Sequence, residues 1–498
     1  MTTHSQDVRP IPYGGGEWGA DATRWRLGAE RFRMITGQWH DDLDAALVTQ
    51  HGAVGRSELG PGSIAMCLIR NVCEELSVLY VDPPTVTTTT DSDVSDLVGP
   101  YGYLEDAQTW NQGTYLQQVT LAEREGLKFL MWQDGQLVTE TVEPHKVVCR
   151  PLPMRPTKLG MVRRCKWLWS HETTYQHQGD GVWVWEVWDI RTEPRYAIHV
   201  HEPTAMENLG TDITGQLVGF DAPEGYPWVW TQGDKAGEPF LPWTLYHAEL
   251  ATTLWDPTRW AELVDGTKDT GVLLTQFLHL MLRAAHTAKW SIGVRQVGSK
   301  ASDGARRTEG GMTVLHEFLD IDDTGGSPGR LGEWKPAASP SEYMTAIQKF
   351  ITLIASVAGI DASHIVRESA DAWSGAALTV DREGKREAQK VYGARFRAAD
   401  EEMVAKCAAL VNINTDSALP ESGYRVSYKA LPLSPEEEEI RRVHAKEMVA
   451  DGRWSEIDAH KYMRPGMTRE EAILDMRRIV ADAALVAAPA KTEEDDNV

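Results

Sequence analysis

The stretch that decides the fold is Arg367–Ala388, "RESADAWSGAALTVDREGKREA". Its first half, "RESADAWSG", is short, polar and rich in small residues. It separates two segments with helical periodicity, one at 339–360 and a longer one at 377–411. Gly375 tolerates a backbone bend at the junction, while Ala376, Ala377 and Leu378 favour helix directly after it. The pattern predicts a small hinged loop between two long helices.

Length and charge limit the classes of protein that the chain can represent. A chain of 498 residues with 42% hydrophobic and 25% charged residues has the composition of a globular protein. This length predicts two to four domains, or one elongated subunit of several parts. The net charge of −23 is opposite to that of a protein that neutralises phosphates over most of its surface. We therefore expect at most weak contact with DNA or RNA.

Cysteine usage and the N-terminus indicate a protein that stays in a reducing compartment. The five cysteines form no CxxC pair, which favours free thiols over disulfides or a zinc site. The N-terminus lacks the apolar core of a signal peptide, and the longest apolar runs are too short to span a bilayer. We expect a soluble protein without a cleaved signal, a membrane partner or a cofactor.

The order of the expected elements is helical, then β-rich, then helical again. Helices are expected near residues 20–38, 62–81 and 105–125, and hairpin patterns fill residues 127–245, including a hairpin around Asp134–Gly135. A helix within 258–290 precedes two strand candidates at 292–297 and 312–318. The C-terminal part predicts capped helices after Ser434, Ser455 and Thr468, followed by an acidic tail.

A basic window interrupts this acidic chain. Between residues 289 and 307 the only acidic residue is Asp303, against five basic residues: Lys289, Arg295, Lys300, Arg306 and Arg307. We predict that these residues contact DNA or an acidic partner surface. A disordered surface loop is the alternative for Lys300–Arg307.

No pattern of catalytic residues is evident. The chain has no phosphate-binding GxxxxGK[ST] loop, no GxSxG elbow and no HExxH helix. His199 and His201 share one face of an expected strand but have no third ligand nearby, and "DIDDTGG" (Asp320–Gly326) lacks the late glutamate of a calcium loop. The 19 tryptophans could fill cores and interfaces or stack on sugars. We expect no enzyme, no metal site and no catalytic residues.

From Ser339 to about Leu485 the chain resembles the portal proteins of tailed bacteriophages. The resemblance rests on "IASVAGIDASHI", then "VRESADAW", then "SGAALTVDREGKREAQKVYGARF", and on the ending "RWSEIDAHKYMRPGMTREEAILDMRRIVAD". It implies an α+β fold: an elongated subunit with a mixed α/β wing, a two-helix stem, a small β clip and a helical crown. The implied parts are a flexible arm at 1–24, the wing at 25–257, the stem helices at 258–288 and 339–360, the clip at 289–338, a channel loop at 361–376, a long helix returning to the wing at 377–433, the crown at 434–486 and a disordered acidic tail at 487–498.

The resemblance also implies a function and partners. A homo-oligomeric ring, of twelve copies in portals, would occupy one capsid vertex of the virion after assembly in the host cytoplasm. Double-stranded DNA would pass through it during packaging and ejection. The other partners implied are a major capsid or scaffolding protein, the large terminase subunit and a head–tail adaptor. The residues implied as lining the channel form one loop, with Ser374 and Gly375 as its hinge: Val366, Arg367, Glu368, Ser369, Ala370, Asp371, Ala372 and Trp373. Two alternatives remain, a Trp-rich carbohydrate-active hydrolase and another phage head–tail ring protein, although adaptors are usually much shorter.

Overall fold

The computed structural model describes most of the chain. The described residues are 17–59, 63–89, 94–99, 102–133, 135–176, 179–201, 210–218, 226–249, 251–255, 260–285, 288–292, 330–334, 339–357, 375–431, 435–464 and 469–487. The helices are α1 Glu17–Thr36, α2 His40–Glu58, α3 Leu68–Leu76, α4 Ser95–Val98, α5 Tyr103–Asp106, α6 Gly113–Glu123, α7 Ala261–Ala285, α8 Pro340–Val357, α9 Gly375–Asn414, α10 Pro435–Ala450, α11 Glu456–Met463 and α12 Arg469–Ala487. The strands are β1 Thr85–Thr88, β2 Glu125–Gln133, β3 Gln136–Val142, β4 Val147–Leu152, β5 Arg155–Trp169, β6 Gly181–Asp189, β7 Arg195–Val200, β8 Trp243–His247, β9 Ala288–Ile292, β10 Arg330–Trp334 and β11 Tyr424–Ser427.

Two antiparallel sheets form the centre of the body. One has the order β3-β2-β8 and the other the order β4-β5-β6-β7. The predicted hairpin is confirmed: β2 and β3 pair directly, and Gly135 in the turn between them has a φ of +77°, which favours glycine. Strand β6 is covered on both faces, since Trp185 and Trp188 point to opposite faces and both are buried.

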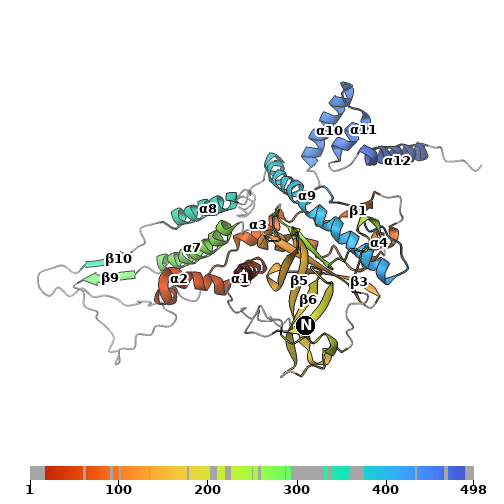
Figure 1. Ribbon diagram of the computed structural model, residues 1–498. Coiled ribbons are helices and arrows are strands. Elements are labelled where there is room, and N and C mark those ends of the chain that lie inside the picture. The colour runs from red at the N-terminus through yellow and green to blue at the C-terminus, as the bar shows by residue number, and fades with distance from the viewer. Residues whose placement is uncertain are drawn as a thin grey trace, which may run out of the picture.

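The long helix α9 crosses the body and shares the core of the sheets (Figure 1). Its buried residues Met403, Val404 and Cys407 belong to the same hydrophobic cluster as Phe129 of β2 and Trp243 of β8. Strand β11 follows α9 and pairs with β1, more than three hundred residues earlier in the chain. The return of the chain after α9 therefore closes the body.

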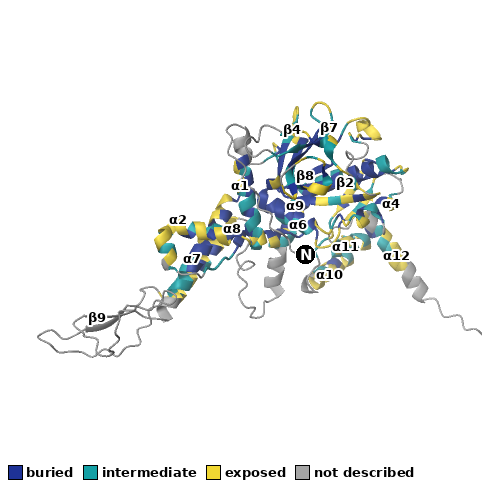
Figure 2. Ribbon diagram, turned by 90° about the horizontal axis from the view of Figure 1, so that it is seen from below, coloured by how far each residue is buried: buried dark blue, intermediate teal, exposed yellow. Residues whose placement is uncertain are grey.

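A second hydrophobic core lies among helices. It joins α2, α3, α7 and α8 through residues such as Leu43, Val72, Leu263 and Ile351. Helices α7 and α8 form an arm that leaves the body, and the β9–β10 ribbon lies at its far end (Figures 1 and 2). Helices α10, α11 and α12 form a separate lobe beyond α9 (Figure 1).

The structure is mixed helix and strand, in agreement with the α+β prediction. Several predicted boundaries differ. The helix expected at 62–81 is only α3, because Cys67 has an extended backbone and the helix ends at Leu76. The helix expected at 105–125 is divided into α5 and α6, with Gln108 between them at a φ of +48°. Helix α1 begins at Glu17, inside the range expected as an arm. The strand candidates at 292–297 and 312–318 lie, apart from Ile292, outside the described residues.

Candidate assembly and channel surfaces

Helices α7 and α8 approach closely because of a glycine. A Cβ built on Gly266 of α7 would lie 2.8 Å from three side-chain carbons of Ile354 on α8. Near the ribbon end of the pair, the rings of Phe277 and Tyr343 stack with 6.1 Å between their centroids. A side chain at position 266 would push the two helices apart, so their close contact depends on glycine at this position.

Helix α7 is fixed to the body by threonine hydroxyls. The hydroxyls of Thr267 and Thr275 each accept a hydrogen bond of 3.3 Å, from the backbone N–H groups of Ile69 and Ile64 respectively. Both threonines are buried, and both also donate to the α7 carbonyl four residues earlier. Lys268 adds an ion pair of 2.5 Å to Glu30 of α1. The arm is thus anchored at its base.

Helix α8 carries apolar residues on two different faces. The residues Ile347, Ile351 and Ala355 are buried against the arm. A second set recurs at spacings of four, three and four residues, which places its members on one line along the helix. This outer stripe of α8 consists of Ala346, Phe350, Leu353 and Val357. Leu353 is 63% exposed and Val357 47% exposed, so in the single chain the stripe faces solvent.

Helix α7 carries an acidic stripe. Glu262, Asp265 and Asp269 follow a spacing of three and four residues, and all three are exposed. The stripe lies on the part of α7 nearest the body. Anionic side chains on such a surface repel phosphate groups.

The ribbon at the end of the arm contains one residue of the predicted basic window. β9 and β10 pair antiparallel, and Lys289 lies opposite Glu333 in the register. Arg295, Lys300, Arg306 and Arg307 lie outside the described residues. The prediction that this window binds DNA or a partner therefore stays a prediction.

The predicted channel loop precedes α9. Val366–Trp373 and the hinge residue Ser374 lie outside the described residues, whereas Gly375 is the first residue of α9. The structure therefore describes the helix to which the loop is attached. At 40 residues this helix is about 60 Å long.

A buried carboxylate, which the sequence did not reveal, anchors α9. The Asp400 carboxylate accepts hydrogen bonds from the hydroxyls of Tyr80 at 2.7 Å, Tyr246 at 2.8 Å and Tyr428 at 2.5 Å. Asp400 is fully buried, and burial raises its pKa even though the three hydroxyls and Lys128 favour the ionised form. Burial likewise lowers the pKa of the Lys128 ammonium to about 8. We call these residues the Asp400 cluster; it ties α9 to the segment at Tyr80, to β8 and to the residue after β11.

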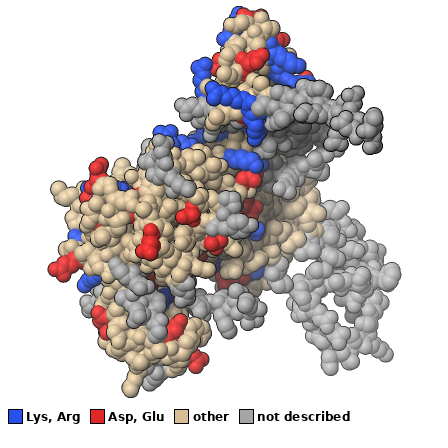
Figure 3. Space-filling view, turned by 90° about the vertical axis from the view of Figure 1, so that its right-hand side faces the viewer, with Lys and Arg blue, Asp and Glu red and all other residues tan. Residues whose placement is uncertain are grey.

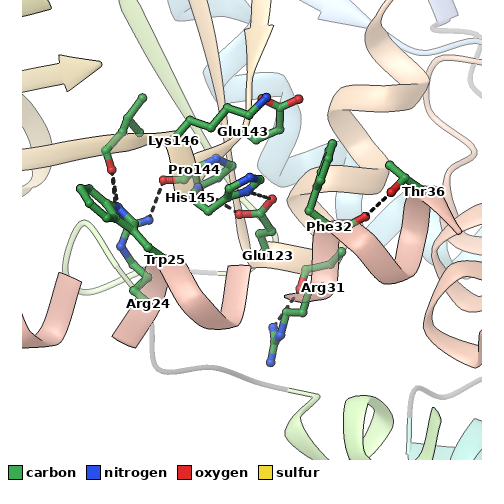
Figure 4. A network of polar contacts seen from close by, with 12 residues as sticks. Arg24, Trp25, Arg31, Phe32, Thr36, Glu123, Glu143, Pro144, His145 and Lys146 are labelled. Atoms are coloured by element: carbon green, nitrogen blue, oxygen red, sulfur yellow. Dashed lines mark hydrogen bonds and ion pairs between the residues drawn. The ribbon is translucent and has the colours of Figure 1, made fainter. Parts of the chain in front are cut away.

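A second buried polar network joins α1 to the sheets (Figure 4). The Glu123 carboxylate accepts a hydrogen bond of 3.1 Å from the His145 backbone N–H and lies 2.9 Å from its ring Nδ1. On α1, the Trp25 indole donates to the Val147 carbonyl, and the Arg31 guanidinium to the Ala122 carbonyl. The cavity beside this network measures about 20 Å³, enough for a single water molecule rather than a substrate. The network therefore positions α1.

The tryptophans of known burial mostly fill the core. Eight of them are buried: Trp25, Trp39, Trp185, Trp188, Trp228, Trp230, Trp243 and Trp260. Trp169 at the end of β5 is 47% exposed. The buried indoles are not available to stack on a sugar, which favours the core interpretation of the high tryptophan content.

The predicted histidine pair is engaged in other contacts. The ring Nδ1 of His199 lies 3.2 Å from the Gly210 carbonyl oxygen, and the ring of His201 stacks on Trp185. Among the described residues, no group of three His, Cys, Asp or Glu side chains converges as metal ligands would. In the same residues, no helix combines the length and apolar character needed to cross a membrane.

No protein-family model and no curated protein sequence matches the chain.

Proposed function

We propose that the chain is the subunit of a phage portal, a ring of twelve copies that conducts DNA into and out of a capsid. In this proposal the body with its two sheets is the wing, α7 and α8 are the stem, the β9–β10 ribbon belongs to the clip, and α10–α12 are the crown. The observation that carries the proposal is the arm. Two antiparallel helices leave a mixed α/β body, end in a β ribbon and carry an apolar stripe on their outer side.

The outer stripe of α8 supports a contact with a second copy. A row of apolar side chains along a helix is typical of a helix-packing seam. Burial of an exposed leucine such as Leu353 would contribute about 1–2 kcal/mol at each interface. In the proposal the outer stripe of α8 in one copy packs against a different surface of the next copy. Such head-to-tail contacts generate rings when the rotation closes.

Charge supports a channel that guides DNA without holding it. The net charge is −23, and Glu262, Asp265 and Asp269 form an exposed acidic row on the arm. Extensive phosphate contacts would give tight, salt-dependent binding that opposes movement. In the proposal the loop Val366–Trp373 projects into the channel with nearly balanced charge, and Ser374 and Gly375 form its hinge. The basic window would lie at the clip, where the terminase and the head–tail adaptor dock.

The experiment that tests the proposal is a measurement of assembly. Native mass measurement and negative-stain images of the purified chain should give a ring, with twelve copies expected. Leu353→Glu should abolish the ring and leave a folded single chain, because a carboxylate would be buried in the seam. Thr352→Glu is the matched control, since Thr352 is exposed on the same helix but lies off the stripe.

Each outcome separates the proposal from its alternatives. Rings that survive Leu353→Glu unchanged would remove α8 from the interface. A wild-type chain that remains single and hydrolyses a glycoside would overturn the proposal in favour of a hydrolase. The chain is also proposed to have no catalytic activity of its own; ATP or DNA hydrolysis that a point mutation in this chain abolishes would contradict that part.

A further inference from the structure

Helix α7 lies between α2 and α8. A Cβ on Gly266 would lie 2.8 Å from side-chain carbons of Ile354 on α8, and a Cβ on Gly271 would lie 2.8 Å from the Leu43 side chain on α2. Positions five residues apart are separated by about 140° around a helix axis, so the two glycines face different sides of α7. Figure 1 shows α8 above α7 and α2 below it. Helices α2 and α8 therefore form the two edges of the arm.

A glutamine side chain holds the three helices in a fixed arrangement. The amide nitrogen of Gln276 on α7 lies 2.9 Å from the ring Nε2 of His51 on α2. The amide oxygen of the same residue accepts a hydrogen bond of 3.0 Å from the Tyr343 hydroxyl on α8. The outer faces of α2 and α8 are therefore presented together, on a single unit.

The contacts of α7 also show which residues of α2 and α8 lie at the same height along the arm. Helix α8 runs antiparallel to α7. The five residues from Gly266 to Gly271 span about 7.5 Å, and the same rise on α8 leads from Ile354 to Lys349. Because Gly271 faces Leu43, Lys349 lies at about the height of Leu43.

The face of α2 that points away from α7 is small and apolar. Asp41, Ala45 and Val48 follow a spacing of four and three residues, which places them on one line along the helix. All three are exposed, and Val48 is 41% exposed. These residues, which we call the outer line of α2, lie within five residues of Leu43. The outer line of α2 thus combines an apolar surface with one carboxylate.

At the same height α8 presents a complementary surface. Ala346 and Phe350 belong to the outer stripe of α8; Ala346 is exposed and Phe350 is partly buried. Lys349 lies beside them and is also exposed. This surface combines apolar side chains with one cation, whereas the outer line of α2 combines them with the anion of Asp41.

We propose that α8 of one copy packs against the outer line of α2 in the next copy. This inference rests on the proposed ring and names the surface that the outer stripe of α8 meets there. Rotation about an axis along the arm keeps each residue at its height, so Phe350 meets Ala45 and Lys349 lies opposite Asp41. Every copy uses α8 at one edge of the arm and α2 at the other. The contact is therefore head-to-tail, as a closed ring requires.

A disulfide experiment on the full-length assembled ring tests this inference. Ala45→Cys and Ala346→Cys place thiols at nearly the same height on exposed positions of the two helices. A disulfide needs Cα atoms about 5–7 Å apart, and within one chain α7 separates the two positions. Of the native cysteines, four are buried and Cys165 is partly buried, so their background reaction is low. Mild oxidation of the double variant should produce a ladder of linked subunits on a non-reducing gel.

The matched control moves one thiol by a single residue. Thr345 is exposed next to Ala346 but lies off the outer stripe of α8. Ala45→Cys combined with Thr345→Cys should give little or no ladder, and each single cysteine variant should stay unlinked.

Charge variants give an independent measurement. In the cross-linking variant, Lys349→Glu should reduce the rate of disulfide formation about threefold, because one favourable pair of charges becomes a repulsive one. Asp41→Lys in the same chain should restore the rate. Lys461→Glu is the control, since Lys461 is exposed on α11 in the C-terminal lobe.

The outcomes distinguish this inference from the proposed function. Rings that form normally without a ladder would overturn the contact between α8 and α2 and leave the proposed function intact. Dimers from Ala346→Cys alone would show that two α8 helices pair with each other, which also overturns it. Equal linking through Thr345→Cys would show random collision rather than a defined contact, with the same consequence. A chain that never assembles would contradict both the contact and the proposed function.

Discussion

Removal of the Asp400 carboxylate should destabilise the protein through the three tyrosines that donate to it. In Asp400→Ala the hydroxyls of Tyr80, Tyr246 and Tyr428 lose their acceptor. An unsatisfied buried donor costs about 1–3 kcal/mol, so three cost about 3–9 kcal/mol before relaxation. Part of this is offset, because burial disfavours the ionised carboxylate and raises its pKa. We expect a net loss of about 3–5 kcal/mol in the free energy of unfolding.

The assay is urea unfolding at neutral pH, followed by tryptophan fluorescence. Tyr428→Phe is the control, since it removes the donor itself and leaves no hydroxyl unsatisfied on that ring. Its expected cost is about 1.5–3 kcal/mol, the range for one hydrogen bond to a charged group. Asp400→Asn keeps one acceptor oxygen, so its loss of unfolding free energy should lie between those of Asp400→Ala and Tyr428→Phe. If Asp400→Ala costs no more than Tyr428→Phe, the carboxylate does not hold the cluster together and the reasoning is refuted.

Three further predictions follow from other parts of the chain. Gly266→Ala should lower the free energy of unfolding by about 1–2 kcal/mol, because the added methyl group would be overpacked against Ile354 by more than the gain in helix propensity offsets. In an Ile354→Ala background the same change should raise the free energy of unfolding. If Gly266→Ala alone stabilises the protein, α7 and α8 do not approach as closely as described. Burial alone would raise the pKa of Glu402, but Lys406 and Lys158 lower it to about 2. The ionised carboxylate therefore stabilises the folded protein above pH 4.5, and this stabilisation is lost as the pH falls toward 2. Because a third of the Glu402 side chain is exposed, we expect this carboxylate to contribute about 1–2 kcal/mol to the free energy of unfolding, and Glu402→Gln should lack that contribution. If the wild-type protein and Glu402→Gln lose stability equally on acidification, the prediction is wrong. Deletion of Ser369–Ala372 should lower the DNA packaged per particle while rings still assemble, and packaging at the wild-type level would remove the loop from the channel.

Much of the secondary structure could be predicted because its signals are local. The hairpin around Gly135, the strands of the four-stranded sheet and the long helices α7, α8 and α9 follow from periodicity and turn residues within one segment. The Ser455 cap of α11 was also predicted, and its hydroxyl accepts a hydrogen bond from the Asp458 backbone N–H. Errors occur where the backbone departs from its local preference, as at Cys67 and Gln108.

The candidate surfaces were predicted less completely. The sequence singled out the loop before α9 and the basic window, but not the outer stripe of α8, whose apolar residues could equally have been core. Periodicity shows that α8 is apolar on two faces, yet only the position of α7 decides which face is buried and which remains exposed. Lys and Arg side chains are prominent on the C-terminal lobe at the top of Figure 3.

The sequence by itself determined the α+β class, the order of the elements and the acidic character of the chain, because these depend on residue type and on neighbours a few positions apart. Only the tertiary structure decided which distant residues meet. Asp400 contacts tyrosines that are 320, 154 and 28 residues away, and no local pattern marks them as partners. Such contacts form because burial of the core brings polar groups together in a medium of low dielectric constant, where each must find a partner within hydrogen-bonding distance.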